Sequence, residues 1–186
     1  MTAEAATSIS GYVAGTWNID PVHSEVGFSV RHMMVSKVRG KFTTFSGQLV
    51  TGADPVDSSV TAEIDLASID TGNEQRDGHI RSADFFEVDK HTKMTFRSTG
   101  VRVVDGEYVL DGDLTIKDVT KNVPLKLELG GFGPDAYGGT RAGFSATGEI
   151  NRKEFGVNFD APMQNGGAVV ADKVSIYLEI EAVLAS

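Results

Sequence analysis

The chain has 186 residues, 40% of them hydrophobic, which suits one globular domain with its own core. Seventeen Lys and Arg stand against 26 Asp and Glu, and the net charge of −9 argues against broad binding to nucleic acid or to anionic membranes. Because cysteine is absent, disulfides, a thiolate nucleophile and a cysteine-based zinc site are excluded. A local basic patch is still present at Lys37, Arg39 and Lys41.

The first residues are small and polar and show no periodicity. We therefore expect a flexible N-terminal arm over residues 1–14 and one ordered domain over residues 15–186. The start of the chain lacks the basic and apolar regions of a secretion signal, and no apolar run approaches the roughly 18 residues of a spanning helix. These features predict a cytoplasmic protein that does not span a membrane.

A two-faced strand is predicted over residues 26–32. Its even positions are Val26, Phe28, Val30 and His32, while its odd positions are glycine or polar. Because strand side chains alternate between the two faces of a sheet, His32 extends an apolar row. If that row lines an enclosed space, His32 places a titratable group at the margin of an apolar lumen.

The same alternation recurs along the rest of the chain and predicts about eight strands in total. The further segments are 38–43, 60–66, 94–103, 108–116, 123–129, 142–150 and 174–182. Asp105 and Gly106 between two of them indicate a hairpin, because both residues tolerate positive φ. Residues 33–36 are expected to form a turn, and residues 71–81 a short helix with a capping box made by Thr71 and Glu74.

Antiparallel strands with short turns and one helix indicate an all-β sandwich or barrel. The sequence favours a barrel, because Gly27, Gly40, Gly112 and Gly148 fall inside strand patterns, where glycine usually marks a bulge or bend that helps a sheet close. Surface loops are expected at 134–139 and 162–170, and either loop could gate an opening. A barrel of this size either packs solid or holds one small ligand, and the pattern leaves both possibilities open.

Neither a metal site nor an active site is predicted. The four histidines, His23, His32, His79 and His91, show no spacing typical of metal ligands on one helix face. Asp20, His23 and Ser24 supply the side chains of a hydrolase triad, but such triads normally assemble from distant segments and no Gly-x-Ser-x-Gly elbow is present. We expect no cofactor.

The helical segment 71–81 combines polar residues with the two aromatic residues that follow it. Arg76, Asp77 and His79 precede Phe85 and Phe86. This arrangement is typical of a helix that plugs one end of a barrel and latches there through its aromatic side chains. Arg76 also offers a rigid fork of donors, which suits an anionic or carbonyl head group.

Four separated motifs occur in order along the chain. They are Trp17 to Ser24 with Phe28, Val30 and His32; Val38 to Phe42; Arg76 to Phe86; and Gly148 to Gly156. In these motifs the chain resembles the YceI family of lipocalin-like polyisoprenoid-binding proteins, and the resemblance covers nearly all of the ordered chain. It implies an extended antiparallel barrel that holds a long isoprenoid or fatty-acid-like chain, often in a homodimer.

The resemblance also marks a set of polar motif residues, without a catalytic mechanism for them. These are Asp20, His23, His32, Arg76, Asp77, His79 and Arg152. The chain departs from the family in two places. It lacks the secretion signal of many relatives, which argues against a periplasmic carrier role, and Asp118 stands where the family turn usually has glycine. The second departure is minor, because Asp tolerates left-handed backbone.

The sequence therefore predicts a barrel that binds, sequesters or transports a polyisoprenoid or similar lipid, with one short helix capping an end. The expected lipid-binding residues are Phe28, Val30, His32, Phe42, Ile64, Arg76, Phe85, Phe86, Met94, Phe96, Leu114, Phe144 and Ile176. The head group would lie near His32 and Arg76. Two alternatives remain: a lipid-ester hydrolase or isomerase that uses His23 or His32 as a base, and a stress-response interaction module with a solid core.

Overall fold

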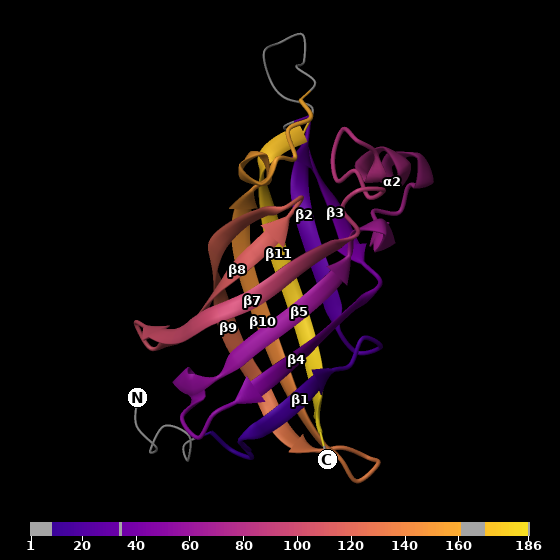
Figure 1. Ribbon diagram of the computed structural model, residues 1–186. Coiled ribbons are helices and arrows are strands. Elements are labelled where there is room, and N and C mark those ends of the chain that lie inside the picture. Colours follow the sequence, from indigo (N-terminus) through magenta and orange to yellow (C-terminus); the bar gives the residue numbers. More distant parts are fainter. Residues whose placement is uncertain (1–8, 34, 161–169, 186) are drawn as a thin grey trace.

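The computed structural model describes residues 9–33, 35–160 and 170–185. Within them, eleven strands form one sheet, and every strand pair is antiparallel (Figure 1). The strands are β1 (Gly15–Ile19), β2 (Glu25–His32), β3 (Ser36–Phe42), β4 (Phe45–Thr51), β5 (Ser59–Asp65), β6 (Ile69–Asp70), β7 (Lys93–Val104), β8 (Glu107–Ile116), β9 (Val119–Pro134), β10 (Thr140–Asn151) and β11 (Val170–Leu184).

The helices are short. Among the described residues, the α-helix is α2 (Glu74–Arg81), and 3-10 helices occupy Pro55–Asp57, Leu66–Ser68 and Arg152–Phe155. None of the helices in the described part of the chain is long and apolar enough to cross a membrane.

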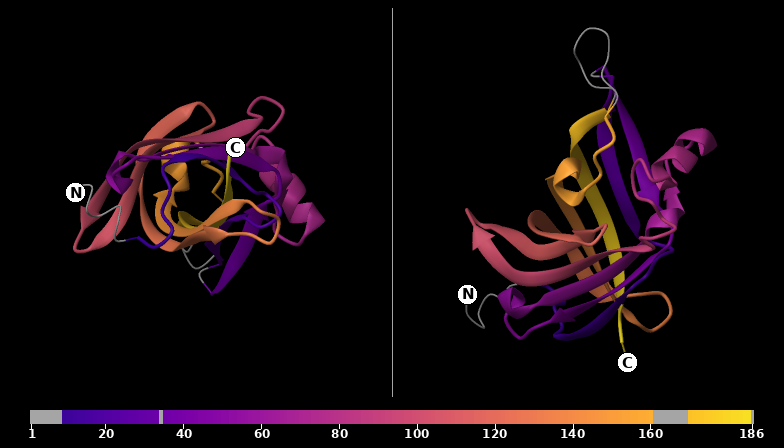
Figure 2. Two further views of the ribbon diagram at one scale, coloured as in Figure 1. Left: turned by 90° about the horizontal axis from the view of Figure 1, so that it is seen from below. Right: turned by 45° about the horizontal axis from the view of Figure 1, so that its top comes forward.

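Eight of the strands close into a barrel. They follow the order β1-β4-β5-β7-β8-β9-β10-β11, and β1 pairs back with β11 through Trp17 opposite Leu184. Seen from below, the strands form a ring (Figure 2, left). The prediction of an all-β antiparallel barrel with one short α-helix is confirmed.

The closure is incomplete at one end of the barrel. Two strands share the long β11: β1 pairs with its C-terminal part, at Ala182–Leu184, and β2 pairs with its earlier part, between Val170 and Glu179. The β2–β3 hairpin continues the wall, but beyond β3 it meets only the two-residue strand β6. Helix α2 lies beside β3 at this end (Figure 1). We call it the helix end, and we call the opposite end, around Trp17 of β1, the tryptophan end.

Several sequence-based expectations need correction. No strand was expected for β4, because Gly47 occupies an inward position between Phe45 and Leu49 and weakens the apolar alternation. The residue that caps α2 is Asn73, whose side chain accepts a hydrogen bond from the backbone N–H of Arg76, so the capping box predicted with Thr71 is wrong. Of the loop predicted at 162–170, only Val170 lies within the described residues, where it begins β11.

The strand glycines follow the expectation only in part. The pairing is regular at Gly40, but a register shift does lie at Gly112, because Ser98 pairs with Gly112 and Gly100 pairs with the next residue, Asp111. Those two glycines face inward and leave room for aromatic rings: a Cβ at Gly40 would collide with the ring of Phe28, and one at Gly112 with the ring of Phe96. Their role is therefore to accommodate cross-strand neighbours on the inner face.

Candidate functional site

The barrel encloses an apolar cavity of about 430 Å³. Its wall follows from the strand alternation, because Val26, Phe28 and Val30 of β2 face inward, as do Ile176 and Leu178 of β11. This volume lies within the range of small-molecule pockets, which are mostly apolar with a few placed polar groups. The interior is therefore hollow on the scale of a ligand.

Every residue in the predicted lipid-binding set lines this cavity. The set comprises Phe28, Val30, His32, Phe42, Ile64, Arg76, Phe85, Phe86, Met94, Phe96, Leu114, Phe144 and Ile176. That these residues contact a ligand stays a prediction. Sequence reasoning missed Tyr12, Phe45, Leu49 and Phe132, which also line the cavity. Tyr12 gave no signal, because it lies in the expected arm; its hydroxyl donates to Gly52 O at 2.6 Å and its ring packs edge-on against Phe132.

The charged side chains that line the cavity are all basic. Arg31, Arg76 and Arg152 contribute to the lining together with His32 and His79, whereas no Asp or Glu is found among the described lining residues. The bias is notable in a chain with 26 acidic residues. A lipid head that carries negative charge or accepts hydrogen bonds would meet donors here and no carboxylate.

Arg76 is held in place by Thr71 at the start of the helical segment. Its Nε donates to Thr71 Oγ1 and its Nη2 to Thr71 O, each at 2.7 Å. The Thr71 hydroxyl in turn donates to the buried carboxylate of Asp77, which also accepts from the Thr71 backbone N–H. Within the described residues, Nη1 of Arg76 has no hydrogen-bond partner, so it is available to a group in the cavity.

Arg152 has a structural role at the same end. It is 5% exposed and donates to four backbone carbonyls, those of Val157, Phe159, Val170 and Ala171. Burial lowers its pKa below the ordinary value. Because its donors are occupied, Arg152 fastens the chain after β10 to the start of β11 and leaves Arg76 as the better candidate for head-group contact.

His79 closes the helix end with aromatic neighbours. Its ring packs edge-on against Phe85 and Phe159, with centroid distances of 5.1 and 4.9 Å, and its Nε2 lies 2.8 Å from Asp84 Oδ2. The expected aromatic latch is therefore present, with Phe85 buried in the main core. His79 is itself exposed, so a residue that lines the cavity reaches solvent at this end.

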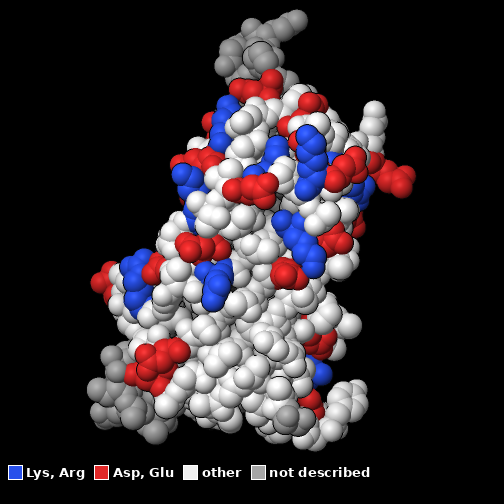
Figure 3. All heavy atoms as spheres, in the orientation of Figure 1, with Lys and Arg blue, Asp and Glu red and all other residues white. Residues whose placement is uncertain are grey.

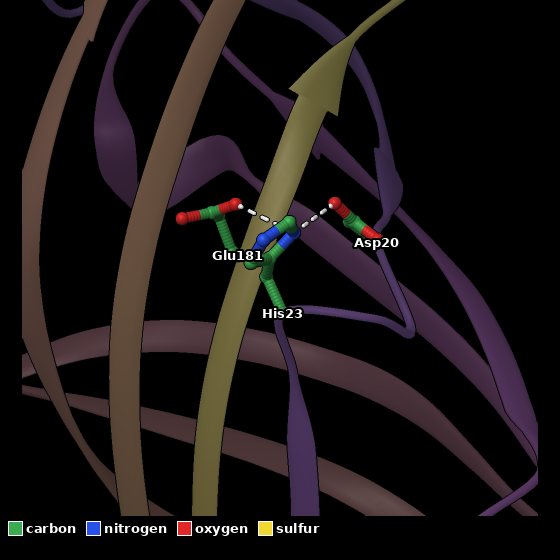
Figure 4. A group of neighbouring side chains, drawn as sticks. All are labelled: Asp20, His23 and Glu181. Carbon is green, nitrogen blue, oxygen red and sulfur yellow. Dashed lines mark hydrogen bonds and ion pairs between the residues drawn. The ribbon is translucent and has the colours of Figure 1, made fainter. Parts of the chain in front are cut away.

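A second polar group lies on the outer face of the barrel, where β1, the turn before β2, and β11 meet (Figure 4). The Nδ1 atom of His23 lies 2.8 Å from Asp20 Oδ2 and 3.6 Å from Glu181 Oε2. Nη1 of Arg141 donates to the same two carboxylates, at 2.8 and 2.6 Å. The hydrogen bonds from Arg141 and His23 hold the pKa of Asp20 well below its ordinary value.

The geometry of this outer group fits neither a metal site nor a hydrolase triad. Asp20, His23 and Glu181 offer ligand atoms within 4.8 Å of one another, but the Arg141 guanidinium already forms ion pairs with both carboxylates, where a metal ion would have to bind. The Ser24 hydroxyl donates to the backbone carbonyl of Glu181 and accepts from its N–H. The group therefore joins the turn before β2 to β10 and β11, and His23 does not line the cavity.

Fold and site together define a lipocalin-like β-barrel that encloses an apolar, ligand-sized cavity. Residues 17–182 match the family model of the YceI-like domain. The chain is 40% identical to a UPF0312 protein of Photorhabdus laumondii over 83% of this chain and 81% of the relative. By sequence and by structure, the chain belongs to the YceI family.

Solved structures share this fold. BcnA of Burkholderia cenocepacia superposes with a TM-score of 0.76 at 25% identity, covering 88% of this chain and 98% of BcnA. A polyisoprenoid-binding domain from Saccharophagus degradans, implicated in plant cell wall breakdown, shares the fold with a TM-score of 0.67 at 14% identity, covering 93% and 100% of the two chains.

Proposed function

We propose that this protein binds a polyisoprenoid or similar long-chain amphipathic lipid in the barrel lumen, and that residues 15–186 form one lipid-binding domain. The observation that carries the proposal is the cavity of about 430 Å³ with an almost wholly apolar lining. Each methylene that a lipid tail removes from water contributes about 0.8 kcal/mol, so a long tail supplies binding energy without further chemistry. The polyisoprenoid named for the Saccharophagus degradans domain is consistent with this ligand class.

The lipid has a proposed direction in the cavity. The tail runs along Phe28, Phe96 and Phe144 toward the tryptophan end, and the head lies at the helix end near His32 and Arg76. This orientation is supported by the basic character of the charged lining and by the available Nη1 of Arg76. The preferred head is accordingly an anionic group or a hydrogen-bond acceptor.

Displacement of a fluorescent fatty acid from the purified protein by unlabelled prenols and fatty acids tests the proposal. Affinity should rise with tail length until the cavity is filled. Phe28→Asp and Phe144→Asp place a carboxylate in the apolar lumen and should each abolish retention, whereas Phe28→Leu should retain the lipid. Unchanged binding in both Asp variants, with folding verified by circular dichroism, would refute a lumenal site.

A binding role, rather than an enzymatic one, is part of the proposal. Support comes from the positions of the histidines: His23 lies on the outer face with its Nδ1 beside Asp20, and His32 lines a cavity whose described lining residues include no Asp or Glu. The hydrolase or isomerase alternative predicts turnover of a lipid ester that disappears in His23→Ala or His32→Ala. If such histidine-dependent turnover of a lipid ester were measured, the binding role would be refuted and the protein would be an enzyme.

We further propose that the protein acts in the cytoplasm as a homodimer. A broad area without charged side chains, over β4 and β1 in the lower centre of the view, supports the dimer (Figure 3). Its outward residues include Asn18 and Gln48, whose side chains hydrogen-bond to each other across the two strands at 3.1 Å. Depletion of charge is typical of interface cores. Analytical ultracentrifugation with Gln48→Lys checks the dimer, and cell fractionation checks the compartment.

A further inference from the structure

The outer side of the β2–β3 hairpin is basic, although the protein as a whole carries a net charge of −9. Arg31 of β2 and Lys37, Arg39 and Lys41 of β3 are all exposed. Lys37, Arg39 and Lys41 point outward because their neighbours in β3, such as Val38, line the cavity. Arg31 stands opposite Lys37 in the strand register and is exposed, although it also contributes to the cavity lining. We call these four residues the basic face.

The charge of the basic face is largely uncompensated. None of its four residues forms an ion pair with another described residue, and only Lys41 stands opposite an acidic residue, Asp70, in the strand register. Elsewhere on the barrel, Lys93 pairs with Glu63, and Arg102 with Asp111. A positive potential therefore persists over the hairpin.

Apolar and aromatic side chains border this basic face. Val35 and Met33, in the turn of the hairpin, are 82% and 42% exposed. Tyr177 of the neighbouring β11 is 42% exposed and accepts a hydrogen bond from Ser29 Oγ. That hydrogen bond, followed by the nearby charges of Lys37 and Arg39, lowers the pKa of Tyr177. Basic residues with exposed aliphatic and tyrosine side chains are typical of surfaces that meet a bilayer interface.

The hairpin also marks the open end of the cavity. His32, the last residue of β2, lines the cavity, and its neighbour Arg31 both lines it and is exposed. On the other side of β3 only the two-residue strand β6 continues the hydrogen-bonded wall, and α2 supplies Arg76 and His79 to the lining. The hairpin projects past α2 at this end (Figure 2, right). A surface that contacts the hairpin therefore also lies close to the cavity entrance.

We propose that the basic face, together with the exposed Met33 and Val35, docks the protein on an anionic lipid bilayer, with the cavity entrance toward the membrane. The acidic remainder of the protein restricts docking to this orientation, because an anionic surface repels it. A second copy of the chain is a poorer occupant, since a two-fold contact through this face would bring like charges together. The inference extends the proposed function by naming the surface from which lipid enters.

Sedimentation with lipid vesicles at low ionic strength tests the inference. The wild type should sediment with vesicles that mix phosphatidylglycerol with phosphatidylcholine, and not with vesicles of phosphatidylcholine alone. Lys37→Gln/Arg39→Gln should weaken this binding roughly 30-fold, because each basic residue near an anionic surface contributes to attraction. Added salt should release the wild type, because it screens the attraction.

The matched control is Lys121→Gln/Lys126→Gln, which changes the net charge by the same amount on exposed residues of β9. This control should bind vesicles within about twofold of wild type. Equal loss in both double variants would overturn the inference, since it would show a dependence on total charge alone. Failure of the wild type to bind anionic vesicles would also overturn it and favour an acidic protein as the partner.

Docking and lumenal binding can fail separately. Lys37→Gln/Arg39→Gln alters only outward side chains, so it should retain lipid supplied in solution while losing vesicle binding. Phe28→Asp should show the reverse. If Phe28→Asp instead lost vesicle binding while the hairpin variant kept it, association would proceed through the lumen, and the docking surface would be refuted.

Discussion

The two ends of the lumen differ in packing and in charge. At the tryptophan end, Trp17 and Ala182 are fully buried, the indole N–H donates to Thr51 Oγ1 at 2.9 Å, and Phe132 packs edge-on against the indole. At the helix end only the two-residue strand β6 continues the wall of strands beyond β3, and Arg76 and His79 line the cavity. The difference indicates that one end secures the fold while the other admits and orients a ligand.

The largest effect should come from breaking the tryptophan end. Trp17→Ala leaves a cavity among Leu49, Ala142 and Ala182 and removes a buried hydrogen bond. We expect it to lower the free energy of unfolding by about 3–5 kcal/mol, measured by urea denaturation. Trp17→Phe, the milder control, should cost less. A loss below about 1 kcal/mol for Trp17→Ala would contradict the assignment of this end to stability.

Filling the space beside Phe96 should narrow the lumen between the two ends. A Cβ at Gly112 would collide with the Phe96 ring, so Gly112→Val forces that ring to move. Overpacking of this kind costs about 1–3 kcal/mol of stability. Long-tailed lipids should lose more affinity than short-tailed ones in the probe-displacement assay. Gly100→Val, at a glycine with open space around it, is the control, and equal behaviour of the two variants would argue against a role for Gly112 in shaping the lumen.

Lipid affinity at the helix end should depend on the positive charge of Arg76. Arg76→Met preserves much of the side-chain volume but removes the donors aimed at a head group. Affinity for a fatty acid should fall by roughly tenfold, while affinity for the fatty alcohol of the same chain length should change less. The measurement is the ratio of the two dissociation constants. Parallel losses for both ligands would place the head group elsewhere.

The smallest expected effect concerns the outer group around Asp20. Arg141 and His23 lower the pKa of the Asp20 carboxyl in the folded state. The stability that this carboxylate contributes is therefore complete above the ordinary carboxyl pKa and is lost as the pH falls. Between about pH 5 and pH 2, the free energy of unfolding of the wild type should therefore fall by about 1 kcal/mol more than that of Asp20→Asn. Denaturant titrations at several pH values check this, and identical pH profiles would exclude the carboxylate of Asp20 as the cause.

Some parts of this account could be read from the sequence. The row of Val26, Phe28, Val30 and His32 predicted an inward face, because two-residue periodicity depends only on local backbone geometry. The strand β4 was missed, because Gly47 replaces an inward apolar side chain. The hollow interior could not be predicted, since it depends on which ring lies opposite which glycine, as for Phe28 and Gly40.

Long-range polar contacts were equally beyond the sequence. Arg141 bonds to Asp20 across 121 positions of the chain, and no local pattern indicates such a pairing. The role of Arg152 as a clamp on four carbonyls likewise depends on where the chain returns to β11. The family motifs marked both Asp20 and Arg152, but only the fold separates the structural residues from those that line the cavity.

Native mass spectrometry of protein purified without detergent shows whether the lumen holds a lipid. We expect a stoichiometric increase in mass, and solvent extraction should identify the bound molecule as an isoprenoid or fatty chain. The increase should be absent from Phe28→Asp. If the protein remains at its bare mass and takes up no prenol or fatty acid when these are supplied, the lumen is not a lipid-binding site.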